Sequence, residues 1–418
     1  MALATAPAAA ATFHVDGSVA QSGDGRSWAE AWRSFADIDW QQLKPGDVLA
    51  ISGGAAGRVY AAPLVVGSSG QAGKPITITA ATDAAHGGPV TIDGAGNEPV
   101  CVRVDERDHV VVRGLTVSGC NESAIQLRNA SGLLAEANRV HALSRGFHVW
   151  RTRESVVRGN TVTTPDYIEL QTDGIYSQEN RGNLYAGNDI VISNAEREGH
   201  DDGIQSYRDR DIVIAGNRIE QRNAKTGNAQ GIFIVDAGGE MVAANNLVIG
   251  LSTRNSLLTL LNQSGTDGRL LAYNNTLVGS RWGVVQLQDA PDSEVKNNIL
   301  ASSQEEAAGI TLDGGKPRAG AIDGNLYAIP HGSPGYDTDR VRLDWDAWQA
   351  LGYEAHGLQG EPGFRNAAQG DYALAADSAA IGRGLPCLRV EVDIAGLPRR
   401  DAARCTIGAY TGTAGMRP

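Results

Sequence analysis

The sequence predicts an all-β solenoid, a fold built by stacking short repeated units. The first observation is an asparagine that recurs eight times at intervals of 22 to 29 residues, usually two positions before a branched apolar residue. Units of this size cannot bury an apolar face alone, so they stack on their neighbours. The second observation is that residues 100–330 contain no long apolar pattern of period 3.6, which excludes a helical solenoid. The recurring residues are Asn138, Asn160, Asn188, Asn217, Asn246, Asn275, Asn298 and Asn325.

Each unit contains three short apolar segments with the alternation expected of strands. The first ends at the asparagine, as in Ser155–Asn160, and the third begins at a glycine, as in Gly174-Ile-Tyr-Ser. Three strands per turn of 22 to 29 residues is the pattern of the right-handed parallel β-helix, and the chain resembles this family of folds. We therefore expect each asparagine to occupy a tight corner in the left-handed backbone region, with its amide bonded to the next coil.

The two ends of the chain have features of their own. Ser27–Trp40 has apolar spacing near 3.6 and predicts an N-terminal capping helix, which would cover an otherwise open coil. Pro75–Ala80 and Val90–Gly94 resemble the opening coils of carbohydrate-active β-helices, including the chondroitinase B and alginate lyase group. About the last fifty residues resemble a closing segment of secreted β-helix proteins. We thus expect a signal remnant or flexible N-terminus (1–12), a cap with the first coils (13–70), the β-helix (71–330) and closing coils with a cap (331–418).

Charge and cysteine content restrict the partners and the compartment. Lys and Arg number 36 against 48 Asp and Glu, a formal net charge of −12 that argues against nucleic acid and suits cations or sugars. Two local cysteine pairs, Cys101 with Cys120 and Cys387 with Cys405, are sensible among the three pairings that four cysteines allow. Met1–Ala11 is rich in small residues, and no segment approaches the roughly 20 apolar residues of a membrane span. We expect a secreted or periplasmic protein, either a monomer or a homotrimer.

Four consecutive coils are about six residues longer than the coils outside them. The additional residues fall between the second and third strands, at Thr163–Thr172, Ser193–Asp201, Gln221–Gln230 and Gly250–Asn255. Stacked insertions predict a wall of loops beside a flat parallel sheet. Because loops on a rigid scaffold are the usual place for function, we expect an extended groove that binds a polymer.

Two aspartates begin third strands at the mouth of this groove. Asp173 and Asp202 occupy equivalent positions in successive coils, about 4.8 Å apart, where they can share one proton or one cation. Aspartate before glycine is also an ordinary turn residue, but the adjacent His200 and Asp201 favour a functional site. We predict catalytic roles within this group and a metal site at Asp173 and Asp202, with Ca²⁺ as a possible ion.

The same register places sugar-binding side chains around the aspartates. Aromatic faces stack on pyranose rings, while Arg and Gln donate directional hydrogen bonds to carboxylates and hydroxyls. Each of these residues also has an ordinary role at a solvated surface, above all Arg208 and Lys225. The expected substrate-binding residues are Arg145, Trp150, Gln178, Gln205, Tyr207 and Arg208, and further expected proton-transfer groups are His148, Tyr176, His200 and Lys225.

The aspartate segments bear on the type of reaction. Thr172-Asp-Gly-Ile and Asp201-Asp-Gly-Ile resemble the paired carboxylates of polygalacturonases over about thirty-five residues. That resemblance implies an inverting hydrolase in which Asp173 and Asp201 or Asp202 act as acid and base. The chain departs from the family, because it has no Gly-His-Gly segment downstream and no Arg-x-Lys sugar clamp in the expected place.

The opening coils resemble lyases and favour a different reaction. A lyase neutralises a uronate carboxylate, removes the C5 proton and protonates the leaving oxygen. Arg145, Arg208 or a bound calcium ion would neutralise the carboxylate. We predict a polysaccharide lyase acting on an acidic polysaccharide or oligosaccharide. The alternatives are an inverting glycoside hydrolase, an epimerase, and a non-catalytic polysaccharide-binding protein such as an adhesin or a phage-type spike.

Overall fold

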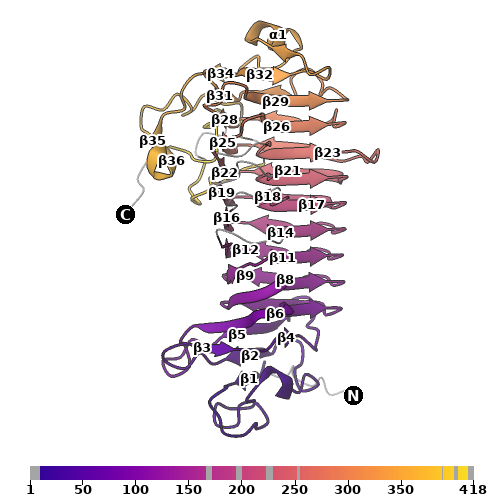
Figure 1. Cartoon of the computed structure of the whole chain (residues 1–418), viewed down its shortest axis with the longest axis vertical. Coiled ribbons are helices and arrows are strands. Elements are labelled where there is room, and N and C mark those ends of the chain that lie inside the picture. Colours follow the sequence, from indigo (N-terminus) through magenta and orange to yellow (C-terminus); the bar gives the residue numbers. More distant parts are fainter. Residues whose placement is uncertain are drawn as a thin grey trace, which may run out of the picture.

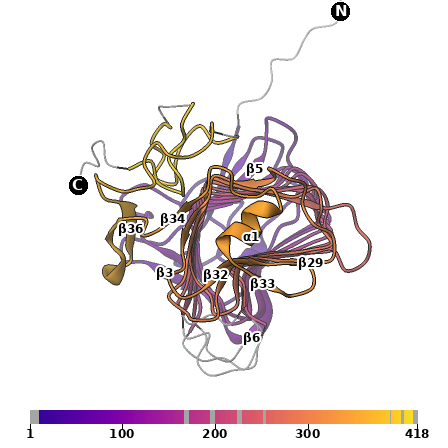
Figure 2. The same cartoon turned by 90° about the horizontal axis from the view of Figure 1, so that it is seen from above.

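Three parallel β-sheets run along the long axis of the molecule, and the chain winds repeatedly from one to the next (Figure 1). The computed structural model of the 418-residue chain describes residues 10–165, 172–193, 200–222, 229–251, 255–387, 389–399 and 403–412. From above, the coils superpose as one roughly triangular tube (Figure 2). The expected β-helix is therefore confirmed.

Sheet 1 collects the first strand of each coil, and its twelve strands pair in parallel. They are β1 (Thr12–Val15), β2 (Val48–Ile51), β5 (Ile76–Ala80), β7 (Val110–Arg113), β9 (Leu134–Glu136), β12 (Val156–Arg158), β15 (Leu184–Ala186), β18 (Arg210–Ala215), β21 (Gly238–Ala244), β24 (Arg269–Tyr273), β27 (Glu294–Lys296) and β30 (Ile322–Asp323).

Sheet 2 collects the second strands. Two long strands, β6 (Val90–Asp105) and β8 (Thr116–Arg128), begin in sheet 2 and continue into sheet 3. The other strands of sheet 2 are β3 (Arg58–Tyr60), β10 (Arg139–His141), β13 (Thr161–Thr163), β16 (Asp189–Ser193), β19 (Arg218–Arg222), β22 (Leu247–Gly250), β25 (Thr276–Gly279), β28 (Ile299–Ala301), β31 (Leu326–Ala328) and β34 (Leu358–Gln359).

Sheet 3 collects the third strands and ends with one antiparallel strand, β33 (Arg342–Leu343). The others are β4 (Leu64–Val65), β11 (Arg145–Trp150), β14 (Asp173–Gln178), β17 (Ile204–Tyr207), β20 (Ile232–Val235), β23 (Leu258–Leu261), β26 (Gly283–Gln288), β29 (Ala308–Asp313) and β32 (Ser333–Tyr336).

Equivalent side chains stack along the axis and fill the interior of the tube. In sheet 3 the inward position is apolar and completely buried in coil after coil. Because burial of apolar surface is the main stabilising contribution, each coil depends on the coils on both sides of it. One inward row runs Phe147, Ile175, Ile204, Ile232, Leu258, Val285 and Ile310.

The eight recurring asparagines form a continuous buried ladder between sheets 1 and 2. The backbone N–H and the Nδ2 of Asn217 both donate to Oδ1 of Asn246, each at 3.0 Å, and the same pattern links every successive pair from Asn138 to Asn325. Glu354 ends the ladder by accepting both bonds from Asn325, at 3.1 and 2.6 Å. The expected coil-to-coil amide bonding is confirmed.

The left-handed corner lies one residue earlier than expected. The residue before each ladder asparagine has positive φ, for example 65° at Gly216 and 55° at Asn245, whereas the ladder asparagines do not. This placement explains the Gly-Asn and Asn-Asn pairs, because glycine and asparagine tolerate positive φ. The second residue of each pair remains free to direct its amide inward.

The predicted helix over Ser27–Trp40 is wrong. Only one 3-10 turn, η1 (Phe35–Asp37), forms there. At Trp32 the backbone bonds to β1 and the residue after it, since Trp32 N–H donates to the His14 carbonyl and Asp16 N–H donates to the Trp32 carbonyl. The buried Trp32 side chain therefore reaches the core from a loop, and that of Phe35 reaches it from η1.

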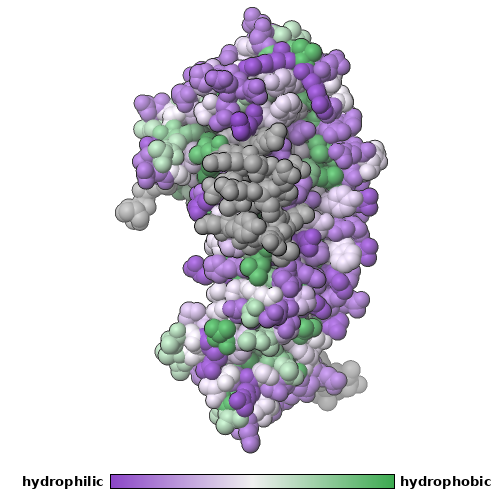
Figure 3. All heavy atoms as spheres, in the orientation of Figure 1, coloured by the Kyte–Doolittle hydropathy of each residue, from purple (hydrophilic) through white to green (hydrophobic). Residues whose placement is uncertain are grey.

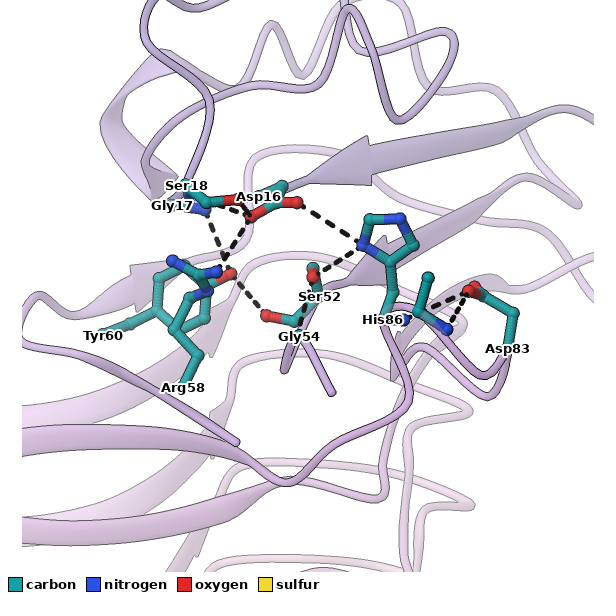
Figure 4. Close-up of polar contacts among 10 residues, drawn as sticks. Asp16, Gly17, Ser18, Ser52, Gly54, Arg58, Tyr60, Asp83 and His86 are labelled. Carbon is teal, nitrogen blue, oxygen red and sulfur yellow. Dashed lines mark hydrogen bonds and ion pairs between the residues drawn. The ribbon is translucent and has the colours of Figure 1, made fainter. Parts of the chain in front are cut away.

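A polar network holds these N-terminal loops together (Figure 4). Asp16 accepts hydrogen bonds from the N–H and hydroxyl of Ser18 and lies 3.4 Å from both Arg58 Nη2 and His86 Nδ1. His86 Nδ1 also lies 2.9 Å from the Ser52 hydroxyl. Both Asp16 and Ser52 therefore approach the same ring nitrogen, an arrangement that fixes the loops and does not form a catalytic triad.

The helical cap lies at the opposite end. Helix α1 (Trp345–Ala350) covers the last coil (Figures 1 and 2), and its Trp348 side chain is completely buried beside Tyr353. The chain then returns along the outside of sheet 2 through β35 (Phe364–Asn366), η2 (Ala367–Gln369) and β36 (Asp371–Leu374), where an apolar cluster holds it.

Both expected cysteine pairs are disulfides, Cys101–Cys120 and Cys387–Cys405. The first joins β6 to β8, and the second closes a loop in the returning C-terminal segment. Among the described residues, no helix has the length and hydrophobicity that a membrane crossing requires.

Candidate functional site

The outer face of sheet 3 brings together most of the predicted site residues. Arg145 of β11 pairs in register with Asp173 of β14. Further along the same strands, one outward row runs His148, Tyr176 and Gln205, and a second row runs Trp150, Gln178 and Tyr207. The stacking expected from counting residues is confirmed, so these side chains form one surface across three successive coils.

Glycines fix the backbone next to the buried aspartates at the edge of this surface. A Cβ at Gly174 would lie 2.4 Å from Ile190 Cγ2 and 2.5 Å from the Gly203 carbonyl, and a Cβ at Gly203 would meet Ile219 and Gly231 equally closely. Only glycine permits the backbone to approach the core so closely at the start of the strand. The Asp-Gly-Ile repeat is therefore a packing requirement that also fixes the positions of Asp173 and Asp202.

The aspartates form a short ladder of their own. Asp202 N–H donates to Oδ1 of Asp173 at 3.1 Å, and Gln230 N–H donates to Oδ1 of Asp202 at 2.8 Å. Asp201 accepts from Thr172 N–H at 2.6 Å. All three aspartates are at most 1% exposed. Burial, followed by the charge of Asp202, raises the pKa of Asp173 well above its usual 3.8, and burial also raises the pKa of Asp202.

His200 is held against this carboxylate group. Its Nδ1 lies 3.0 Å from Oδ2 of Asp202, and its ring packs against Phe233 with centroids 4.9 Å apart. Burial opposes protonation of His200, but the hydrogen bond and charge of Asp202, with Asp173 and Asp201, raise its pKa above 6.5. A protonated His200 therefore partly neutralises the acidic ladder.

Arg145, His148 and Tyr176 form a second group, which lies on the open side of the strands. The Arg145 guanidinium lies 4.6 Å from the centroid of the Tyr176 ring, and the His148 and Tyr176 centroids are 5.3 Å apart. Burial and the positive charges of Arg145 and Arg128 lower the pKa of His148 to about 4, so this ring is neutral at neutral pH. Burial also raises the pKa of Tyr176, which therefore keeps its proton.

The second outward row is rich in stacked cations and rings. Arg128 and Arg151 lie 5.4 and 4.8 Å from the Trp150 ring, and Arg208 lies 4.8 Å from the Tyr207 ring. Arg208 is exposed at the corner beyond β17. This row presents flat aromatic surfaces and positive charge together, a combination suited to acidic sugars.

Two residues of this surface were not predicted. Gln126 lies in register with His148, with its Nε2 3.5 Å from His148 Nδ1, and Arg128 lies in register with Trp150. Both are on β8, two coils before the first aspartate. The alternation of inward and outward residues that identified His148 and Trp150 also places Gln126 and Arg128 on the outer face. They were not selected because their coil has neither a long insertion nor an aspartate.

The predicted metal site fits calcium only in part. Carboxylate oxygens are suitable ligands, and Oδ2 of Asp173 is buried with no hydrogen-bond partner among the described residues. Within the parts of the chain that the structure covers, however, no three His, Cys, Asp or Glu side chains are grouped to hold a metal ion.

Much of the expected loop wall falls outside the described residues. Lys225 lies there, as do residues 166–171, 194–199, 223–228 and 252–254 of the insertions. Two cavities of about 310 and 280 Å³ lie in or against the returning C-terminal segment and are not part of the predicted surface. On the side shown in Figure 3, hydrophobic atoms form small separate patches among hydrophilic ones.

Comparisons with known proteins agree with the architecture. Residues 100–277 match a family model described as a right-handed beta helix region. The structure of pectate lyase Pel9A superposes with a TM-score of 0.59 at 14% identity, covering 97% of this chain and 98% of that one. XylC in complex with xylose gives a TM-score of 0.54 at 9% identity, with 95% and 98% covered. None of the curated proteins matches this chain in sequence. The chain therefore has the fold of the right-handed parallel β-helix proteins.

Proposed function

We propose that the protein is a polysaccharide lyase that cleaves a uronate-containing polysaccharide by β-elimination on the outer face of sheet 3. The observation that carries this proposal is the group formed by Arg145, His148 and Tyr176 on adjacent strands. It combines a fixed positive charge, a neutral imidazole and a protonated phenol within one coil spacing. These are the three functions that β-elimination requires.

Each residue has a definite role in the proposed step. Arg145 pairs with the uronate carboxylate, which makes the neighbouring C5 proton more acidic. His148 removes that proton through a ring nitrogen, the C5 electron pair forms the C4–C5 double bond, and the C4–O bond breaks. Tyr176 donates its proton to the departing oxygen. The products are an unsaturated uronate end and a new hydroxyl end, so atoms and charges balance.

The low pKa of His148 fits this order of events. About 4 is low for a base, but the cause is burial together with the charges of Arg145 and Arg128. A bound carboxylate neutralises part of that positive charge, so substrate binding raises the basicity of His148. The base thus becomes strongest when the substrate is in place.

The remaining surface residues would bind the polymer. Trp150 and Tyr207 offer stacking faces, and Gln178, Gln205 and Arg208 offer hydrogen bonds to hydroxyls or carboxylates. Pel9A, which shares the fold, is a pectate lyase by its description. An acidic polysaccharide outside the cell also agrees with the two disulfides, and we propose that the protein is exported.

Asp173 and Asp202 would hold a calcium ion, with Asp201 and His200 beside them. The chemistry that such an ion supplies is neutralisation of a uronate carboxylate. The unpartnered Oδ2 of Asp173 and the raised pKa values of the pair support this assignment.

The geometry does not favour the inverting hydrolase. That mechanism needs two carboxyl groups about 6.5–9.5 Å apart with room for water between them. Asp173 and Asp202 are instead hydrogen-bonded neighbours, and both accept backbone N–H bonds while completely buried. Neither carboxylate faces a sugar ring as freely as His148 and Tyr176 do.

The test is to incubate the protein with polygalacturonate, alginate and chondroitin sulfate, with calcium and with chelator. Two products are measured: unsaturated uronate by its ultraviolet absorbance, and new reducing ends. We expect both to appear together and to fall at least about a hundredfold in His148→Ala and Tyr176→Phe. The matched controls are His331→Ala and Tyr207→Phe, in which the absorbance should still rise.

The outcomes separate the alternatives. Reducing ends without ultraviolet absorbance would identify a hydrolase and overturn the proposal. Binding without either product would identify a non-catalytic polysaccharide-binding protein. If activity survives in the chelator but disappears in Arg145→Ala, the neutralising charge is Arg145 and the calcium assignment is wrong.

A further inference from the structure

A cavity lies on the same face of sheet 3 as the proposed active site, towards the C-terminal end. It has a volume of about 270 Å³ and is lined by Trp282, Gln286, Thr311, Asp313, Tyr336 and Arg340. These residues come from β26, β29 and β32 and from the loops beside them. None of them belongs to the site described above.

Strand register connects this cavity to the proposed active site. The outward row that contains Gln205 continues through Phe233 and Thr259 to Gln286, Thr311 and Tyr336. β26 lies four strands beyond β14, which carries Tyr176, so the two sites are separated by about 19 Å along the axis. The returning C-terminal segment packs against sheet 2, on a different side of the tube from this row (Figure 2).

The cavity has the chemistry of a sugar site. The Trp282 ring is 46% exposed and lies nearly parallel to Tyr336, with centroids 5.9 Å apart and an interplanar angle of 11°. An exposed indole supported from behind by a second ring offers a rigid apolar face to a pyranose. Among the described residues, nothing bonds the Gln286 amide, and Arg340 Nη2 lies 3.5 Å from Asp313 Oδ2. These groups can bind hydroxyls and a uronate carboxylate.

We infer that this cavity is a remote subsite, in which one uronate unit of the polymer stacks on Trp282 while another part of the same chain occupies the Arg145–His148–Tyr176 site. The inference rests on the proposed function for the identity of the polymer. Simultaneous contact at both positions raises the affinity for long chains, because the second contact is intramolecular. Short oligomers reach only one position at a time.

The test measures binding separately from cleavage. Isothermal titration with galacturonate and mannuronate oligomers of increasing length is performed on the wild type and on Trp282→Ala, Trp282→Phe and Val59→Ala. Long oligomers should bind Trp282→Ala about three- to tenfold more weakly, while short ones bind equally. Trp282→Phe should restore most of the affinity, and Val59→Ala, which removes an exposed apolar side chain in the N-terminal region, should match the wild type.

Each result is decisive for one of the two proposals. Equal binding of long oligomers by wild type and Trp282→Ala would overturn the subsite, whatever the catalytic activity. Length-dependent binding that needs Trp282, in a protein that forms no unsaturated product, would support the subsite and reject the lyase. Absence of binding to all uronate oligomers would overturn both the subsite and its ligand class.

Discussion

At the scale of single residues, different environments on the outer face of sheet 3 shift the pKa values of its histidines in different directions. His148 is half-buried, and desolvation with the charges of Arg145 and Arg128 lowers its pKa, whereas His200 is bonded to Asp202, which raises its pKa. The pKa values of two histidines on the same surface are therefore shifted in opposite directions. Such divergence among neighbouring titratable groups is typical of sites that transfer protons.

The pKa of His148 provides a prediction that does not depend on activity. Its ring should titrate near pH 4 in the wild type, as followed by histidine NMR. Arg145→Ala removes the positive charge that lowers the pKa of His148 most, so this pKa should rise. Arg139→Ala removes an exposed arginine from sheet 2 and should leave it unchanged. A pKa of His148 that is equal in Arg145→Ala and wild type would show that the guanidinium does not influence the ring.

Residue positions were predictable from the sequence, but residue environments were not. Counting along the repeat correctly stacked Arg145 on Asp173 and His148 on Tyr176, because parallel coils place equivalent residues at one height. Counting could not show that both aspartates are completely buried and bonded to backbone N–H groups. That property depends on the glycine contacts at Gly174 and Gly203, which involve residues of sheet 2 and of the next coil.

At the scale of structural elements, the asparagine ladder is the main polar element of the interior. Each amide satisfies the corner backbone of two coils at once, since Asn217 Nδ2 donates both to the Tyr185 carbonyl and to Asn246 Oδ1. A buried polar group without such partners costs about 1–3 kcal/mol. The ladder therefore gives hydrogen-bond partners to buried backbone groups at eight corners and joins them in one cooperative network.

Breaking the ladder in its middle should be strongly destabilising. Asn217→Ala leaves the N–H and Nδ2 of Asn188 and the carbonyl of Tyr185 without their partner. We expect the free energy of unfolding in urea to fall by about 2–5 kcal/mol. The exposed Asn97→Ala is the control and should change it by less than about 0.5 kcal/mol. Equal stability of the two variants would mean that water replaces the lost amide.

The end of the ladder should depend on pH. Burial raises the pKa of Glu354 from its usual 4.5 to about 8, and its carboxyl oxygens accept from Asn325 and Tyr327. Between these two pH values the unfolded chain loses its proton while the folded protein keeps it. The stability that protonated Glu354 contributes is therefore complete below about pH 4.5 and is lost as the pH rises through about 8.

The matched variant for this prediction is Glu354→Gln, which has no titrating proton. At low pH it should be less stable than wild type, since its amide nitrogen cannot accept a hydrogen bond as Oε1 does from Asn325. As the pH rises to about 8, the wild type should lose stability, by up to about 5 kcal/mol across the window, whereas Glu354→Gln should not. Urea unfolding curves that shift in parallel for the two proteins would show that Glu354 is ionised throughout.

At the scale of the whole molecule, the solenoid is a one-dimensional stack whose two ends are closed differently. Loops tied around Asp16 close the first coil, and helix α1 closes the last. The repeat in the sequence predicted that both ends would be capped, but it did not predict the secondary structure of each cap. Apolar spacing near 3.6 over Ser27–Trp40 favoured a helix, yet in the folded protein the backbone of this segment pairs with β1, and that tertiary pairing prevails over local periodicity.

The two caps lead to a prediction about how the stack unfolds. In a solenoid each coil is stabilised mainly by its neighbours, so damage at one end should spread gradually from that end. Trp348 is the largest completely buried side chain and fills the top of the last coils. Trp348→Ala should remove about 3–5 kcal/mol of local stability. Trp345→Ala, on the same helix but half-buried, should cost less.

Hydrogen exchange measured by mass spectrometry shows which coils lose stability in Trp348→Ala. In Trp348→Ala, amides of β26, β29 and β32 should exchange faster than in wild type, with the effect fading towards β17 and absent at β9 and β12. Amides of β11 and β14, which carry the proposed active site, should then exchange as slowly as in the wild type. Amides of the strands that line the Trp282 cavity should exchange faster. Uniform acceleration along all coils would instead show that the solenoid unfolds as a single cooperative unit, in which case an end mutation would also weaken the distant active site.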